Sequence, residues 1–426
     1  MDLGHVRETT LPNGLHVIVK HEPYWGIVGF TIQVRCGSVR DPEGKAGLCH
    51  LMEHLLFENK SKVRPGLGRA VEDLGGYINA ETLRDFVSVE TLVASPQFGE
   101  ALKLLADRVT RATFDAAAVN AEKTIILQEL ADRNSNADVL VDEALWQAAF
   151  EKHPYRWPIG GTKESLDAIK PEDAVAQYKR FFVPNNSALI VVGDVDPDAV
   201  FEAAKSAFGS WEKREVDWKA PAPEPSMHEV RARILHAQNR ASVFTMGFRA
   251  PGLDKPAEVC AMDLIYSWLG QGENSWLQRV LVREKKLAVA ADCDFLTERF
   301  PGLLTVTAVC APEQELEARS AVAGAIRQIR DTPLTDADLD RVKPMVYTQY
   351  AFSNETYLDQ ARSAGFYEMI GDYKFAFEYT DLIMKVTPAD VQAVARKYLD
   401  PDAYAAAVLR PQKGEGQDQE AGLSWH

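Results

Sequence analysis

The sequence lacks the features of a membrane-spanning protein. No stretch of its 426 residues reaches the roughly 18 consecutive apolar residues that a membrane helix requires. The amino-terminal residues, MDLGHVRE, contain no apolar core and are not a signal peptide, so we expect any signal to be absent from this form of the chain. A transmembrane anchor is therefore not expected.

The chain also has fewer basic than acidic residues, and only five cysteines. The chain has 47 lysines and arginines against 62 acidic residues, a net charge of −15. This balance argues against a nucleic acid or an anionic membrane surface as a partner. The cysteines are odd in number, contain no Cys-x-x-Cys pair and predict no disulfide framework; they are Cys36, Cys49, Cys260, Cys293 and Cys310.

The composition is that of a soluble globular protein, with 46% hydrophobic and 26% charged residues. The length suggests two or more domains, each large enough to bury its own core. An internal repeat supports this division. Pro171 maps to Pro388, 217 residues later, and the shift holds without a gap to an apolar strand at 188–192 and 405–409. Each copy predicts a helix begun by proline, a turn and a strand.

The chain is therefore predicted to contain two similar halves, residues 1–212 and 231–412. A linker at 213–230 joins them, and its Ala-Pro-Ala-Pro-Glu-Pro run favours stiff, extended chain. The polar residues 413–426 are expected to be a disordered tail. Apolar strands mix with long helices, and hairpin-like links between strands suggest a mostly antiparallel sheet in each half. Helices packed on one face of the sheet would make this an α+β fold. We expect the halves to enclose a chamber like a clamshell.

The stretch His50-Leu-Met-Glu-His54 is the most informative in the chain. In a helix, His50 and His54 lie one turn apart on one face, with Glu53 on the neighbouring flank. Two imidazoles at i and i+4 beside a carboxylate can hold a zinc ion and supply a base for its water. The order His-x-x-Glu-His is the inverted zinc motif. The alternative is a pair of packed helix histidines, which is less favoured because the apolar residues keep to the opposite face.

A catalytic zinc site needs a third protein ligand. Glu122 and Glu129 are seven residues apart, two helical turns on one face, and Ile126 lies close to that face. We assign Glu129 as the third ligand and Glu122 as a carboxylate that orients a ligand. A charged, solvated helix face explains the same spacing equally well.

The run from Gly47 to Phe57 resembles the zinc motif of the pitrilysin, insulysin and mitochondrial processing peptidase family. Family-like stretches such as LPNGLHV at 11–17 and GGYINAET at 75–82 extend the resemblance over nearly the whole chain. In that family a ligand Glu follows the second histidine by roughly 75 residues, which is the position of Glu129, and another Glu precedes it by seven. The resemblance implies a zinc endopeptidase with one Zn²⁺ per chain and Glu53 as the base. It looks like the bacterial zinc-bearing subunit of the processing-peptidase-like branch.

The second half departs from the family pattern. It contains no second His-x-x-Glu-His, and the helix expected at 257–268 occupies the corresponding place. Family members contribute an Arg and a Tyr from this half, which bind substrate and stabilise the transition state. This chain keeps Arg283, but Val289 occupies the Tyr position and cannot donate a hydrogen bond. We therefore expect a heterodimer with a same-fold partner that carries the Arg/Tyr pair.

The resemblance also implies a substrate site and a compartment. A peptide is expected to add as a strand to a sheet edge at 76–82, where Asn79 and Ala80 would touch it; an ordinary glycine turn entering a strand is the alternative. The periplasm is the expected compartment and the cytoplasm the alternative. Two other functions stay open, a non-catalytic scaffold subunit of a processing-peptidase-like complex and a protein that binds peptides without cutting them.

Overall fold

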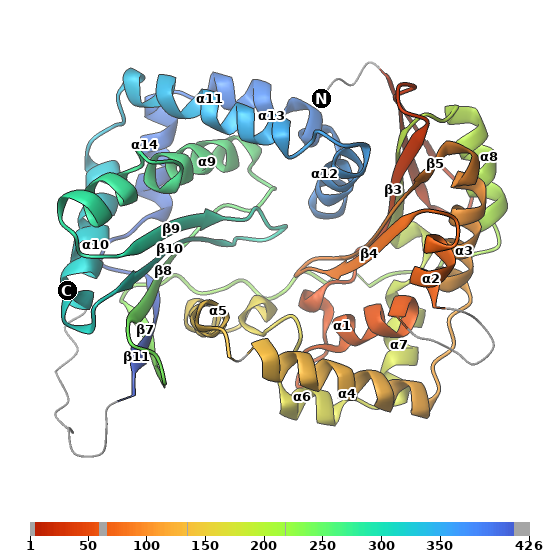
Figure 1. Ribbon diagram of the computed structural model, residues 1–426, viewed down its shortest axis with the longest axis horizontal. Helices are drawn as coiled ribbons and strands as arrows, with labels where there is room; N and C mark the ends of the chain where they lie inside the picture. The colour runs from red at the N-terminus through yellow and green to blue at the C-terminus, as the bar shows by residue number, and fades with distance from the viewer. Residues whose placement is uncertain (1–4, 59–65, 134, 218, 413–426) are drawn as a thin grey trace. The chain divides into compact units, whose positions relative to one another are not determined.

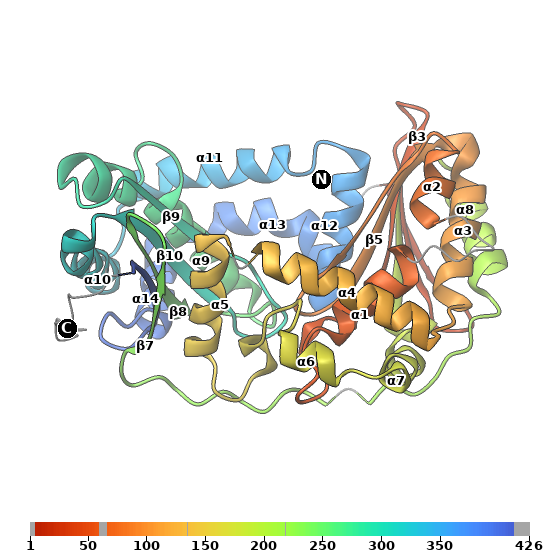
Figure 2. The ribbon, with the colours of Figure 1, turned by 60° about the horizontal axis from the view of Figure 1, so that its bottom comes forward.

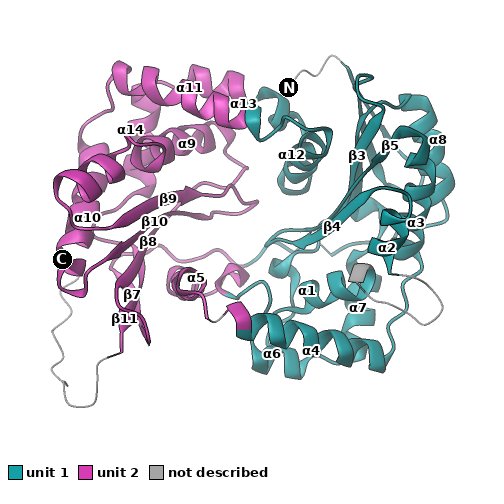
Figure 3. Ribbon diagram, in the orientation of Figure 1, with its two compact units in different colours: residues 1–131, 157–221, 351–378 teal, residues 132–156, 222–350, 379–426 magenta. Residues whose placement is uncertain are grey.

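The computed structural model describes residues 5–412 apart from 59–65, 134 and 218 (Figure 1). The tail expected at 413–426 lies outside the described residues. The chain divides into two compact units, each built around one sheet (Figure 3). Unit 1 comprises residues 1–131, 157–221 and 351–378, and unit 2 comprises residues 132–156, 222–350 and 379–426.

Unit 1 holds a six-stranded sheet in the order β1-β2-β6-β3-β5-β4. All its pairings are antiparallel except β2–β6, so the last strand of the first half runs parallel to β2. The strands are β1 (Val6–Thr10), β2 (His16–His21), β3 (Ile27–Val34), β4 (Tyr77–Thr82), β5 (Val87–Ala94) and β6 (Ser187–Gly193).

Unit 2 repeats this plan with five strands in the order β7-β11-β8-β10-β9. Again one pairing, β7–β11, is parallel and the others are antiparallel. The strands are β7 (Arg231–Ala237), β8 (Ser242–Arg249), β9 (Ala290–Phe295), β10 (Leu303–Cys310) and β11 (Ala405–Pro411). The prediction of two similar α+β halves with mostly antiparallel sheets is confirmed.

Helices make up most of the remaining described structure. Unit 1 contains α1 (Leu48–Glu53), α2 (Leu67–Glu72), α3 (Phe98–Thr110), α6 (Lys163–Ala168), α7 (Pro171–Phe181), α8 (Pro197–Phe208) and α12 (Tyr357–Ile370). Unit 2 contains α5 (Ala137–Ala149), α9 (Pro256–Gly270), α10 (Glu315–Asp331) and α14 (Pro388–Tyr398). Three helices have residues in both units: α4 (Ala116–Arg133), α11 (Asp336–Phe352) and α13 (Lys374–Lys385). None of the described helices is long and apolar enough to cross a membrane.

The repeat predicted from the two prolines is present in both units. Helix α7 begins at Pro171 and α14 at Pro388, and each leads to the last strand of its sheet. The third helical residue of each caps its own helix in the same way. Asp173 accepts a hydrogen bond from the backbone N–H of Lys170 at 2.8 Å, and Asp390 accepts one from Thr387 at 2.9 Å. Sequence register and capping chemistry therefore agree.

Each sheet is covered on both faces, one of them by a helix from the other half of the chain. On β3, Phe30 points to α3, where its ring meets Phe98 edge-on at 5.4 Å. Gly29 lies on the opposite face of the strand, where a Cβ atom would lie 2.5 Å from the backbone of Leu358 in α12. In unit 2, Gly247 of β8 similarly faces Leu145 of α5. Helix α12, although late in the sequence, is therefore part of unit 1.

The contact between α12 and the first sheet is polar. Lys20 donates to Gln360 at 2.8 Å, and Arg362 forms an ion pair with Glu90. Arg35 and His16 both contact the Glu368 carboxylate, at 2.8 and 3.1 Å.

The pKa values at this contact follow from the pairing. The hydrogen bond to Glu368 raises the pKa of His16. Burial raises the pKa of Glu368, but the hydrogen bond to His16 and the charge of Arg35 outweigh it and lower that pKa overall. Charge pairing at Glu368 thus contributes to holding α12 on the sheet.

The later part of the Pro-rich linker is anchored within unit 2. Glu224 accepts hydrogen bonds from three consecutive backbone N–H groups, those of Glu151, Lys152 and His153, at 2.6, 2.9 and 2.8 Å. Arg249 lies 3.5 Å from the same carboxylate and places its guanidinium over the ring of Phe150. The carboxylate thereby supplies hydrogen-bond acceptors for three backbone N–H groups in a short turn, where no helix or strand partner is available to them.

Candidate metal centre

Helix α1 carries the His-x-x-Glu-His stretch, and its amino end is held by a buried carboxylate. Asp41 accepts hydrogen bonds from the backbone N–H groups of Gly47 at 2.7 Å and Cys49 at 2.8 Å. Burial raises the pKa of Asp41 to about 7, against the hydrogen bonds at Cys49 and Gly47, which lower it. Gly47 has φ of 92°, and a Cβ atom there would lie 2.6 Å from the carbonyl oxygen of Gly160. The turn into α1 therefore requires glycine.

Cys49, next to His50 in the sequence, is packed against other buried side chains. Its Sγ is buried and lies 3.4 Å from that of Cys36. Gln177 contacts both sulfur atoms. All five cysteines of the chain are free and buried, in agreement with the absence of a disulfide pattern.

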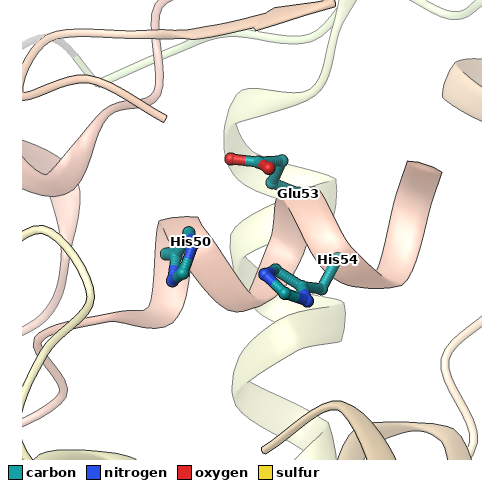
Figure 4. Close-up of side chains that lie close together, drawn as sticks. All are labelled: His50, Glu53 and His54. Atoms are coloured by element: carbon teal, nitrogen blue, oxygen red, sulfur yellow. The ribbon is translucent and has the colours of Figure 1, made fainter. Parts of the chain in front are cut away.

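The two histidines and the glutamate of the motif converge. The rings of His50 and His54 have their centroids 4.7 Å apart, and Figure 4 shows them on successive turns with Glu53 on the neighbouring flank. One possible ligand atom from each of the three residues lies within 4.8 Å of the others. After Glu53 the helix widens into a π-helical turn, η3 (His54–Glu58), a distortion often found at functional sites. Imidazole nitrogen and carboxylate oxygen are donors that zinc accepts.

Helix α4 places both predicted glutamates against His54, and Figures 1 and 2 both show α4 running beside α1. The Oε2 atom of Glu122 lies 3.4 Å from Nδ1 of His54, and the Oε2 atom of Glu129 lies 3.6 Å from Nε2. The two carboxylates therefore approach different nitrogens of one ring. The Glu122 side chain is 9% exposed and that of Glu129 is 44% exposed. The carboxylate of Glu122 is therefore enclosed by the protein, whereas that of Glu129 is open to solvent.

A contact that the sequence analysis missed links the motif to the sheet. Thr82, the last residue of β4, donates from Oγ1 to Oε2 of Glu53 at 2.5 Å, and both residues are buried. The signal for it was present, because Thr82 ends the GGYINAET stretch. Nothing in local spacing, however, indicates which helix a strand end will touch.

Strand β4 forms one edge of the first sheet and pairs only with β5 among the described strands. Asn79 is exposed and Ala80 is half-buried against the core. The strand that was predicted to receive a peptide therefore lies at the edge of the sheet. It ends at Thr82, the residue that donates a hydrogen bond to Glu53.

Arg283 belongs to unit 2, whereas the motif belongs to unit 1. It lies on the π-helical segment η7 (Leu277–Glu284), half-exposed, where its Nε donates to the carbonyl of Gln278 at 3.3 Å. Its guanidinium lies 3.7 Å from Glu273. Val289, which stands in the expected Tyr position, is 76% exposed. Helix α9, at the place expected to correspond to α1, carries no histidine.

Comparisons with known proteins agree with this description. Residues 16–163 match a family model described as insulinase, peptidase family M16, and residues 168–345 match one described as the peptidase M16 inactive domain. The chain is 25% identical over 411 residues to the zinc protease PqqE of Helicobacter pylori, a match that covers 94% of this chain and 92% of that protein. It is 22% identical to the uncharacterized zinc protease YmxG of Bacillus subtilis, covering 95% and 98% of the two chains.

Solved structures show the same fold. A protease from Helicobacter pylori superposes with a TM-score of 0.87 at 22% identity, covering 95% of this chain and 99% of the other. A putative M16-like peptidase from Alicyclobacillus acidocaldarius gives 0.84 at 20% identity, covering 97% and 100%.

Proposed function

The chain belongs to peptidase family M16, and from this premise we propose that it is a zinc metalloendopeptidase subunit that hydrolyses peptides or unfolded segments. The observation that carries the proposal is the grouping of His50, Glu53 and His54, with Glu122 and Glu129 on either side of the His54 ring. A set of imidazole and carboxylate donors of this kind fits zinc.

In this proposal His50, His54 and Glu129 hold one Zn²⁺, and Glu122 orients the His54 ring. When bound, zinc supplies a water made acidic enough to lose its proton near neutral pH and polarises the peptide carbonyl. The Oε2 atom of Glu122 lies 3.4 Å from Nδ1 of His54, while Nε2 on the other side of the ring faces Glu129. The buried position of Glu122 keeps this orientation in place without competition from solvent.

Glu53 acts as the base that takes the proton from the attacking water and gives it to the leaving amine. Its Oε2 accepts a hydrogen bond from the Thr82 hydroxyl, which fixes the position of the carboxylate. Thr82 is a positioning residue, since it contacts Glu53 and not the reacting atoms. Because Thr82 also ends β4, the strand that would pair with substrate is joined directly to the base.

The substrate is proposed to add as a strand along the free edge of β4, with Asn79 and Ala80 beside it. Main-chain hydrogen bonds would supply most of the affinity, so extended or unfolded segments are preferred to folded ones. Arg283 is proposed as a further contact for substrate or for the transition state.

The active form is proposed to be a heterodimer with a homologous subunit that carries the Arg/Tyr pair. The exposed apolar side chain of Val289 supports this, because it offers no donor at the position where relatives have a tyrosine. The same observation favours the second candidate function, a subunit that binds peptides or serves as a scaffold without cutting. The periplasm is kept as the proposed compartment on the family resemblance, with the cytoplasm as the alternative.

Metal analysis combined with a peptide-cleavage assay tests the proposal. The wild-type chain should bind about one zinc, and His50→Ala and Glu129→Gln should each lose most of it, since three ligands are needed. Glu53→Gln should keep zinc and lose cleavage. Glu202→Gln, an exposed change on α8, is the matched control. Full zinc retention in both ligand variants would overturn the ligand assignment, and zinc binding without cleavage under any partner would establish the non-catalytic function.

A further inference from the structure

Unit 2 contains a cavity of about 340 Å³ that has no role in the proposed peptidase chemistry. Its lining residues come from the ends of α9 and α10, the start of α11 and the segment η7. One wall is apolar and aromatic, formed by Trp268, Trp276, Ile329 and Leu334, all of them buried. Cavities of this size and lining are typical of small-molecule sites.

The lining also includes a guanidinium with one N–H group that has no acceptor in the described part of the chain. Arg341 borders the cavity from the second turn of α11, and its Nη1 atom is buried without a hydrogen-bond partner in the described part of the chain. A buried N–H of a charged group without an acceptor is destabilising. A second cation, Arg279, lines the cavity from η7 and is half-exposed, 3.5 Å from Glu284 at the surface.

The one acidic side chain that lines the cavity already has hydrogen-bond donors within the chain. Asp338 accepts from the indole Nε1 of Trp268 at 3.2 Å, and from the backbone and hydroxyl of Thr335 at 2.9 and 2.7 Å. These bonds cap α11 and fix the indole as part of the wall. Asp338 balances one of the two guanidinium charges, which leaves a net charge of +1 on the lining.

We propose that this cavity binds a small monocarboxylate with an apolar or aromatic body, about the size of a dipeptide. The carboxylate would lie between Arg341 and Arg279, since a guanidinium fork matches the two oxygens of a carboxylate. The body would lie against Trp268 and Trp276, whose rings offer large apolar faces. A net charge of +1 suits a single carboxylate better than a phosphate dianion, which would leave charge uncompensated in a partly enclosed site.

The experiment compares N-acetyl-leucyl-phenylalanine with its C-terminal amide by isothermal titration calorimetry on the full chain. The two probes differ only in the charge and acceptor capacity of the group that Arg341 would meet. We expect the acid to bind with a dissociation constant below about 1 mM, and the amide about 10–100-fold more weakly, the effect of one charge-assisted bond. The same titration on His50→Ala separates this site from binding at the metal centre, because that variant should retain it unchanged.

Arg341→Gln tests the assignment within the cavity, with Arg327→Gln as the matched control. Arg327 is an exposed arginine on α10 that pairs with Asp402 outside the cavity. Arg341→Gln should weaken acid binding about tenfold or more and leave the amide unaffected, whereas Arg327→Gln should change neither. Acid binding weaker than about 1 mM, equal binding of acid and amide, or unchanged acid binding in Arg341→Gln would each overturn the proposal. If circular dichroism shows that Arg341→Gln is misfolded, the acid-versus-amide comparison on the wild-type chain decides.

Discussion

Replacing Glu122 by glutamine tests the division of roles between the two carboxylates that flank His54. Its Oε2 atom lies 3.4 Å from Nδ1 of His54, and the two side chains are 9% and 8% exposed. Glutamine has nearly the same shape and leaves α4 intact, so the change removes one negative charge and little else. On the proposed function, the variant should still bind zinc, but more weakly.

The size of the effect follows from the geometry. At 3.4 Å the contact is longer than an ordinary hydrogen bond of about 2.7–3.2 Å, so the lower part of the range for charged hydrogen bonds applies, about 1.5–2 kcal/mol. At about 1.4 kcal/mol per factor of ten, this corresponds to a loss of about 10–30-fold in zinc affinity. Replacement of a carboxylate that orients a metal-bound histidine typically costs about 10–100-fold, which agrees.

Competition with a fluorescent zinc chelator measures this loss directly. Glu122→Gln should lie between the wild type and Glu129→Gln, for which we expect a loss above about 100-fold because a ligand is removed. Glu202→Gln serves again as the control, since its carboxylate is exposed on α8. A Glu122→Gln variant that binds zinc as tightly as the wild type, or that loses as much as Glu129→Gln, would refute the reasoning.

Three further predictions concern stability, pH and assembly. Glu224→Ala should lower the free energy of unfolding by about 2–3 kcal/mol in urea denaturation, because three backbone N–H groups lose a charged acceptor. Glu229→Ala, a change at an exposed residue, should have little effect. Equal effects of the two changes would contradict the anchoring role of Glu224. Glu368 raises the folded-state pKa of His16 above 6.5. The contact between His16 and Glu368 therefore stabilises the folded protein fully below pH 6.5, and this stabilisation is lost as the pH rises through the raised pKa. Urea midpoints measured upward from that pH should therefore fall, and Glu368→Gln should flatten the curve; an unchanged slope would disprove the linkage. The isolated chain should cleave peptides slowly and gain about 10²–10³-fold with a partner that supplies an oxyanion donor; a cleavage rate that no same-fold partner alters would rule out the heterodimer.

Periodicity was sufficient to predict the parts of the site that lie on single helices. The i, i+4 spacing of His50 and His54 and the seven-residue spacing of Glu122 and Glu129 are intrahelical geometry, and the structure places these residues together as helices require. That the second helix meets the first at His54 was supplied by the family resemblance and not by spacing. The carboxylate pair alone was equally compatible with a solvated face.

Contacts between distant segments were not predictable in this way. Thr82 reaches Glu53 because a strand end and a helix meet in space, and neither segment carries a periodic signal for the other. The Pro-rich run predicted an extended linker, but the anchoring of Glu224 depends on three backbone N–H groups from a turn more than 70 residues earlier. Helix α12 has polar residues that contact polar side chains on β2 and β5 and the residue that follows β3. This pairing becomes visible only once the sheet is formed.

The placement of α12 also means that unit 1 can finish folding only late in the synthesis of the chain. The sheet of unit 1 contains residues up to Gly193, yet the helix that covers one of its faces begins at Tyr357. The hydrogen bond from Lys20 to Gln360 therefore joins residues 340 positions apart. Until the ribosome has released that segment, polar side chains such as Gln33 and Arg35 face solvent or a chaperone. Pairings this distant in sequence are slow to form and leave intermediates exposed to aggregation. The first half of the nascent chain therefore holds the metal motif well before it can become fully native.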